Sequence, residues 1–166
     1  MNTVEKVAEF HRAFGHPHDR EPGIPATSAM EIRRLWAHHH GMDTRAKSLN
    51  NHAAAEGSMP LLRLQLIQEE LAELAEAMAR EDLVAVLDAL CDLQVVVDGT
   101  FLAYGLDKVK DEAFAEIMRA NMSKLDADGN PIVSPSGRIV KSDLYEPPHL
   151  LDLLGGEEDV EAEDQK

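Results

Sequence analysis

The sequence predicts an all-α protein: a bundle of four to five helices with a small C-terminal hairpin or irregular arm. Apolar residues recur at helical spacing through most of the first 125 residues. Serine, aspartate, proline and glycine stand where these patterns begin and end, as expected for helix termini. At 166 residues the chain is long enough for one domain, which we expect to span residues 1–155.

The sequence marks the first helix more clearly than the second. Residues 4–14 repeat apolar side chains every three or four positions, and Gly15 ends the pattern. Ser28 and Glu31 then form a capping box that opens a second helix. Residues 37–57 are polar and alanine-rich without a clear period, so they are predicted to form a long loop or a frayed helix.

The next helices are better marked. Residues 61–80 keep a 3.6-residue apolar period without glycine. Asp82 can cap a helix that runs to Tyr104 and stops at Gly105. Asp107 is expected to cap a last helix that reaches about residue 125.

The C-terminal part of the sequence predicts little regular structure. Turn residues flank the short apolar runs 131–133 and 138–141, as in a hairpin. Residues 156–166 are acidic and lack aromatic side chains, which predicts a disordered tail.

Composition excludes several classes of protein. The formal charge is −15, with 31 acidic and 16 basic residues, so nucleic acid is not an expected partner. The apolar stretch 83–104 contains Asp88, Asp92 and Asp98, which predicts a buried helix and no membrane span. Cys91 is the only cysteine and is expected to pack as a small apolar residue. Without a disulfide framework or a secretory signal, we expect a cytoplasmic protein.

Acidic residues interrupt the apolar stripes of two consecutive helices. Glu69, Glu70 and Glu73 continue a stripe of leucines and alanine on the helix 61–80. Asp88 and Asp92 lie one turn apart on the apolar helix that follows. This placement predicts that all five carboxylates face a cleft.

Such a cleft needs positive charge, because an unpaired buried carboxylate costs several kcal/mol. Residues 64–107 contain ten acidic residues and one basic residue, Arg80. An all-oxygen ligand set favours Mg²⁺, with Mn²⁺ as a possible substitute. The alternatives are a solvated acidic face, or aspartates satisfied by buried donors. A di-iron bundle is disfavoured, since the only Glu-x-x-His is Glu146 to His149 in a proline-containing loop.

These motifs resemble a known family. Glu69-Glu70-Leu-Ala-Glu73, followed by an aspartate-bearing helix, is similar to the motifs of the MazG-like all-α NTP pyrophosphohydrolases. The segment Arg119-Ala-Asn-Met-Ser-Lys124 resembles the phosphoribosyl-ATP pyrophosphohydrolase-like branch, which includes MazG-like enzymes acting on dUTP.

The resemblance implies roles for particular residues. Glu69, Glu70, Glu73 and Asp92 would hold Mg²⁺, whereas Asn121 and Lys124 would contact the nucleotide. Ala89 stands where the family motif has a glutamate, so Asp88 would have to supply the missing metal ligand. Family members are homodimers or dimers of dimers, and the apolar helix 83–104 is consistent with such burial.

The resulting hypothesis is hydrolysis of a nucleoside triphosphate to a monophosphate and pyrophosphate, with dUTP or another non-standard nucleotide as the leading substrate. Glu70 is the candidate base for the attacking water. Lys124 would neutralise charge on the phosphate and Asn121 would position sugar or phosphate. The alternatives are a phosphoribosyl-ATP pyrophosphohydrolase and a non-catalytic nucleotide-binding helical dimer.

Overall fold

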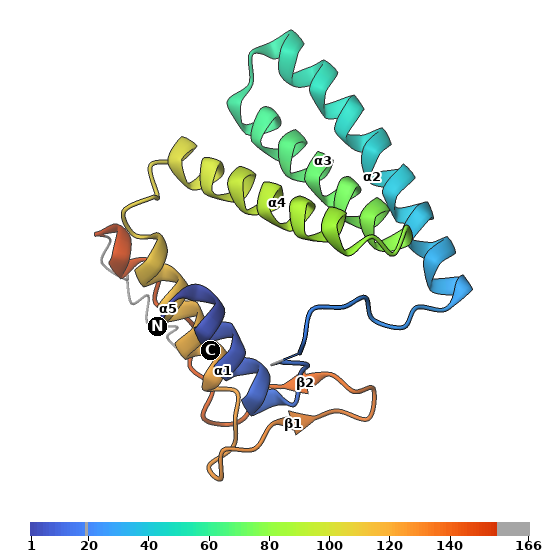
Figure 1. Cartoon of the computed structure of the whole chain (residues 1–166). Coiled ribbons are helices and arrows are strands. Elements are labelled where there is room, and N and C mark those ends of the chain that lie inside the picture. Colours follow the sequence, from blue (N-terminus) through green and yellow to red (C-terminus); the bar gives the residue numbers. More distant parts are fainter. Residues whose placement is uncertain (19, 156–166) are drawn as a thin grey trace, which may run out of the picture. The chain divides into compact units, whose positions relative to one another are not determined.

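The structure, a computed structural model, describes residues 1–18 and 20–155. Its elements are, in order, α1 (Thr3–Phe14), α2 (Ala29–Glu56), α3 (Met59–Ala79), α4 (Leu83–Ala103), α5 (Lys110–Met122), β1 (Ile132–Val133), β2 (Ile139–Val140) and the 3₁₀ helix η1 (Asp152–Leu154) (Figure 1). The predicted all-α class with a C-terminal hairpin is confirmed. None of the helices in the described residues has the length and apolarity that a bilayer crossing requires.

The chain divides into two compact units, each described here by itself. One unit is Pro22–Asp107, which holds α2, α3 and α4. The other combines Met1–Glu21 with the chain from Lys108 onward. The single domain expected over residues 1–155 stays a prediction.

The helix α2 corrects the prediction for residues 37–57, which are neither a loop nor a frayed end. The helix runs unbroken for 28 residues, from the capping box of Ser28 and Glu31 to Gly57, whose φ is 62°. Alanine has the highest helix propensity, so an alanine-rich segment needs no apolar period to be helical. The helix is also held by its packing along α3.

Small side chains form the contacts between α2, α3 and α4. Helix α3 packs against α2 and against α4 (Figure 1). The buried apolar side chains of this unit are alanines: Ala46, Ala53, Ala72, Ala75, Ala77, Ala79 and Ala89. Because alanine adds so little bulk, the helix backbones can approach one another closely. The larger side chains therefore lie at the margins of these contacts.

A tight turn joins α3 to α4, and the predicted cap of α4 is present. Asp82 caps α4, where its Oδ1 accepts hydrogen bonds of 3.1 Å from the backbone N–H groups of Val84 and Ala85. Glu81 has a φ of 55°, in the left-handed region that ordinarily favours glycine after a helix. The turn fixes the pairing of α3 with α4, and with it the relative position of their carboxylates.

The outer face of α4 departs from the expectation of a buried helix. Large apolar side chains are exposed along it, with exposed fractions of 78% for Val84, 63% for Leu87, 67% for Val95 and 65% for Leu102. Cys91, expected to be packed, is exposed as well. The helix is apolar, but its own unit buries only the side that faces α3.

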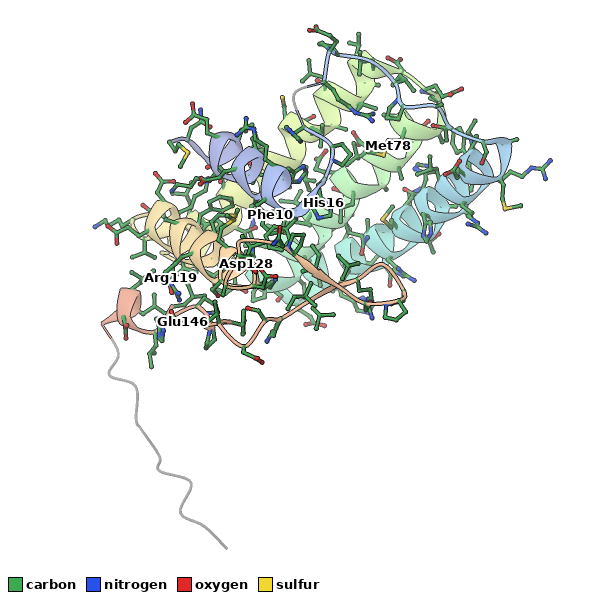
Figure 2. The ribbon with its side chains drawn as sticks, turned by 90° about the horizontal axis from the view of Figure 1, so that it is seen from below. Phe10, His16, Met78, Arg119, Asp128 and Glu146 are labelled. Atoms are coloured by element: carbon green, nitrogen blue, oxygen red, sulfur yellow. The ribbon has the colours of Figure 1, made fainter. Side chains whose placement is uncertain are left out.

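In the other unit α1 packs against α5. Asn2 and Glu5 form a capping box at the start of α1, and Gly15 ends the helix with a φ of 69°. The ring of Phe10 lies 4.4 Å from that of Phe14 and 5.8 Å from that of His16 (Figure 2). These rings provide much of the apolar contact around α1.

Two predictions for the C-terminal part have different outcomes. Asp107 does not cap α5, which begins at Lys110 after Val109 without a side-chain cap and ends at Met122. The hairpin is confirmed: β1 and β2 pair antiparallel, with Ile132 opposite Val140 and Val133 opposite Ile139. The predicted acidic tail, residues 156–166, lies outside the described residues.

Candidate active site

The five predicted metal ligands come from the facing sides of two neighbouring helices. Glu69, Glu70 and Glu73 lie on α3, whereas Asp88 and Asp92 lie on α4. Glu69 and Glu70 are half-buried, and the other three are exposed. These side chains lie on neighbouring helices, at the border between the helix contact and solvent, and their role as metal ligands stays a prediction.

The pKa of Glu70 is affected by the other four carboxylates. Partial burial raises the pKa of Glu70, and repulsion by four neighbouring carboxylates raises it further: Glu73, Asp92, Glu69 and Asp88. Glu70 is thus a carboxyl group in an environment of excess negative charge, where a bound cation would be stabilised.

A groove of about 230 Å³ lies beside these carboxylates. Its lining consists of Glu73, Glu76, Ala77, Arg80, Ala85, Asp88 and Ala89. Three of these are alanines, so the groove exists because both helices have small side chains there. The other four are charged, which suits a polar ligand better than an apolar one.

Two charged residues of the groove, Glu76 and Arg80, are not among the predicted site residues. The Nε of Arg80 lies 3.4 Å from the Oε1 of Glu76, one turn earlier on α3. The signal was available, because Glu76 follows Glu73 by three positions and Arg80 is the one basic residue of the segment. The ion pair of Arg80 is therefore with Glu76, and among the described residues no ion pair of Glu70, Asp88 or Asp92 is found.

The donor chemistry of the cluster fits a hard divalent cation, since every candidate ligand is a carboxylate oxygen. Among residues 1–18 and 20–155, however, no three acidic, histidine or cysteine side chains stand close enough together to hold a metal ion. Like charges repel one another when no cation lies between them. Metal binding would therefore require these side chains to move closer together.

Ala89 is the position where the sequence departs from the family motif. It is 4% exposed and lies in the contact between α4 and α3. Asp88 precedes it, is exposed and lines the groove. Asp88 is therefore the carboxylate available to stand in for the missing glutamate.

Asn121 and Lys124 belong to the other unit, at the end of α5. The Nζ of Lys124 donates a hydrogen bond of 2.7 Å to the Oδ1 of Asn121. Both side chains are half-buried. The structure brings these two residues together, and their contact with a nucleotide stays a prediction.

A second charged cluster, also on α5, is fully compensated. Arg119 donates two hydrogen bonds of 2.8 Å to the carboxylate of Glu116 and a third, of 2.9 Å, to Glu146 (Figure 2). The backbone N–H of His149 also donates to Glu116, at 2.8 Å. The guanidinium of Arg119 and this N–H lower the pKa of Glu116 to about 2. The cluster fastens the segment after the hairpin onto α5.

Comparison with known proteins is consistent with this site. A family model described as phosphoribosyl-ATP pyrophosphohydrolase matches residues 37–121. The fold is similar to that of a candidate NTP pyrophosphohydrolase from Exiguobacterium sp. 255-15, with a TM-score of 0.56 and 25% identity over 93% of each chain. No curated protein matches the sequence. The matched segment includes the five carboxylates and Asn121, whereas Lys124 follows it.

Proposed function

Because the chain belongs to the phosphoribosyl-ATP pyrophosphohydrolase family, we propose that it is a metal-dependent hydrolase that splits a nucleoside triphosphate into a monophosphate and pyrophosphate. One observation carries this proposal. Partial burial raises the pKa of Glu70, and the negative charge of four carboxylates, Glu73, Asp92, Glu69 and Asp88, raises it further. Such an arrangement destabilises the empty site and favours the binding of a divalent cation.

The residues that would hold Mg²⁺, or Mn²⁺ in its place, are Glu69, Glu70, Glu73, Asp88 and Asp92. When bound, the metal would neutralise phosphate charge and lower the pKa of an attacking water. Glu70 is the residue we assign to accept the proton of that water, because its raised pKa makes it a better base than an ordinary glutamate.

We also propose nucleotide-binding roles for two residues at the end of α5. Lys124 neutralises negative charge on the phosphate oxygens, and Asn121 positions the sugar or a phosphate. Their mutual hydrogen bond of 2.7 Å holds the ammonium group in a fixed place beside the amide. An ammonium group ordered in this way loses less conformational freedom when it binds a phosphate.

For the substrate we propose dUTP or another non-standard nucleotide, on the resemblance of the Arg119–Lys124 segment to enzymes of that kind. Phosphoribosyl-ATP is the second candidate, since the family model bears its name. The replacement of a motif glutamate by Ala89 favours a third possibility, a protein that binds a nucleotide without cleaving it.

Pyrophosphate release tests the proposal directly. We expect the wild type to release pyrophosphate with Mg²⁺ from at least one member of a panel that contains dUTP, dCTP, dATP and phosphoribosyl-ATP. Glu70→Ala and Glu73→Ala should abolish most of this activity. Glu56→Ala, which removes an exposed glutamate from α2, serves as the matched control and should retain it.

Two outcomes would count against the enzyme. Wild-type rates in both Glu70→Ala and Glu73→Ala would show that the carboxylates have no part in hydrolysis. Calorimetric binding of a non-hydrolysable dUTP analogue, with no pyrophosphate release from any nucleotide of the panel, would favour the non-catalytic alternative.

We also propose that the protein is a homodimer or a dimer of dimers. The exposed apolar side chains of α4, Val84, Leu87 and Val95 among them, border Asp88 and Asp92 on the same helix. A second copy that covered this face would bury apolar surface and exclude water from the carboxylates. Light scattering at micromolar concentration should show a dimer or tetramer. Leu87→Asp should shift the species towards the monomer, and a monomeric wild type would contradict the proposal.

A further inference from the structure

Arg63 is a cation in the contact between α3 and α4 that the proposed mechanism has not used. It is half-buried on α3, and its side chain crosses to α4. There its Nη1 lies 2.6 Å from the point that a Cβ on Gly99 would occupy. Any side chain at position 99 would displace the guanidinium group, so glycine provides its space.

The location of Arg63 relates it to the carboxylates. Arg63 precedes Glu70 by seven residues, and Gly99 follows Asp92 by seven, which is two turns on each helix. The guanidinium group therefore lies on the same line of the helix pair as Glu70 and Asp92. The separation along the helix axis is about 10 Å.

Among the residues that the structure describes, no hydrogen bond or ion pair of the Arg63 side chain is found. A structural role, in which the aliphatic part of arginine covers the seam between two helices, would leave the guanidinium free to turn towards water. Here it is instead drawn over α4 against the backbone of Gly99. A planar guanidinium in this position can donate two parallel hydrogen bonds to a phosphate group.

We propose that Arg63 binds the terminal phosphates of the triphosphate, the part that leaves as pyrophosphate, and that Gly99 keeps its place open. The inference rests on the proposed function. In that reaction the water oxygen bonds to the α-phosphorus and its proton passes to Glu70. The bond from this phosphorus to the bridging oxygen breaks, and the oxygen leaves with the electron pair. Arg63 neutralises the charge that develops on this leaving group.

Binding of inorganic pyrophosphate with Mg²⁺, measured by calorimetry, tests the proposal without requiring turnover. Arg63→Ala should weaken this binding by about tenfold to a hundredfold, the usual effect of losing hydrogen bonds to a charged group. Binding of a nucleoside monophosphate should change much less, because the monophosphate lacks the terminal phosphates. Arg63→Lys should bind pyrophosphate more tightly than Arg63→Ala does, since lysine keeps the positive charge but lacks the planar group that donates two parallel hydrogen bonds.

Two glycine variants separate a local effect from a loss of folding. Gly99→Ala should weaken pyrophosphate binding, because the new Cβ displaces the guanidinium without removing its charge. Gly41→Ala on α2 is the control, since a Cβ there meets no atom within 4 Å, and it should bind as the wild type does. Where Arg63→Ala fails to fold, Arg63→Lys and Gly99→Ala provide the test.

The binding and hydrolysis experiments distinguish a failure of this inference from a failure of the proposed function. Equal pyrophosphate affinity in the wild type, Arg63→Ala and Gly99→Ala would overturn the role of Arg63, as would equal losses for pyrophosphate and monophosphate. A wild type that binds no pyrophosphate would overturn it too. A wild type that binds pyrophosphate through Arg63 but hydrolyses no nucleotide would leave the inference standing and remove the proposed reaction.

Discussion

Glu70 and Glu116 are both glutamates on helices, yet their surroundings have opposite effects on them. Around Glu70 on α3, burial and four carboxylates raise its pKa. Around Glu116 on α5, Arg119 and a backbone N–H lower the pKa to about 2. In the part of the chain that the structure describes, no ion pair of Glu70 is found, whereas Arg119 lies 2.8 Å from Glu116.

The contrast separates a structural charge cluster from a binding site. Every charge of the Arg119 cluster is satisfied by the chain itself, and its hydrogen bonds tie a C-terminal segment to a helix. The carboxylates of α3 and α4 are left with a charge that folding does not balance. A surplus of this kind lowers stability unless something binds to it, which is a mark of functional sites.

The largest expected difference between the two clusters is in catalysis. Glu70→Gln should lower the rate of pyrophosphate release by about a hundredfold or more, because it removes a proton acceptor and a ligand charge together. Glu116→Gln should change the rate at most a few-fold. Steady-state assays at saturating Mg²⁺ compare the two variants. Equal losses in both would mean that the distinction drawn from charge compensation is wrong.

The acid stability of the protein should depend on Glu116 and is expected to show the next largest effect. A carboxylate whose folded pKa is lowered from 4.5 to about 2 contributes stability above pH 4.5, and this contribution disappears as the pH falls towards 2. Glu116→Gln should therefore be less stable than the wild type at pH 7. The difference should vanish near pH 2.

Denaturant unfolding between pH 2 and pH 7 measures this difference. Glu9→Gln, at an exposed position of α1, is the control for the loss of one negative charge. If the stability of Glu116→Gln and of Glu9→Gln depended on pH in the same way, the hydrogen bonds of Arg119 and His149 to Glu116 would not contribute to stability.

A smaller effect is expected in the turn that aligns the two carboxylate helices. Glu81 has a φ of 55°, and for residues with a Cβ this left-handed conformation costs roughly 1–2 kcal/mol. Glu81→Gly should raise the free energy of unfolding by about 1 kcal/mol. Thermal unfolding would show this as a slightly higher midpoint. A destabilised variant would indicate that the Glu81 side chain makes contacts that outweigh the strain.

The smallest effect is expected from the acidic tail. Residues 157–166 have few apolar side chains to bury. Their removal should leave the melting temperature and the turnover unchanged. A clear loss of either after truncation would show that the tail binds to the rest of the protein.

The sequence predicts the parts of the fold that have a strong local signal. Helices α3 and α4 follow from a 3.6-residue period and from Asp82, and the hairpin follows from its turn residues. The start of α2 follows from its capping box, but its continuation through residues 37–57 is not predicted, because it packs through Ala46 and Ala53, which a search for large apolar residues undervalues. The start of α5 was misplaced because Asp107 is a good capping residue that α5 does not use.

Prediction of the candidate site from the sequence has the same limit. The five carboxylates could be proposed as metal ligands from the sequence because each lies on an apolar stripe of its own helix. Arg63 could not be identified in this way, because its importance depends on which residue of α4 it meets. That pairing is set by the turn at Glu81 and by the contacts of buried alanines such as Ala77 and Ala89, and neither helix encodes it alone.

The dependence of thermal unfolding on Mg²⁺ tests the central claim, that the α3 and α4 carboxylates form a cation site. At a hundredfold excess over Kd, Mg²⁺ should stabilise the wild type by about 2.7 kcal/mol, a rise in Tm of roughly 5–10 °C. Na⁺ at equal ionic strength should not do so. Asp92→Asn should lose most of the shift and Glu116→Gln should keep it. A wild type indifferent to Mg²⁺, or an Asp92→Asn variant with the full response, would contradict the account.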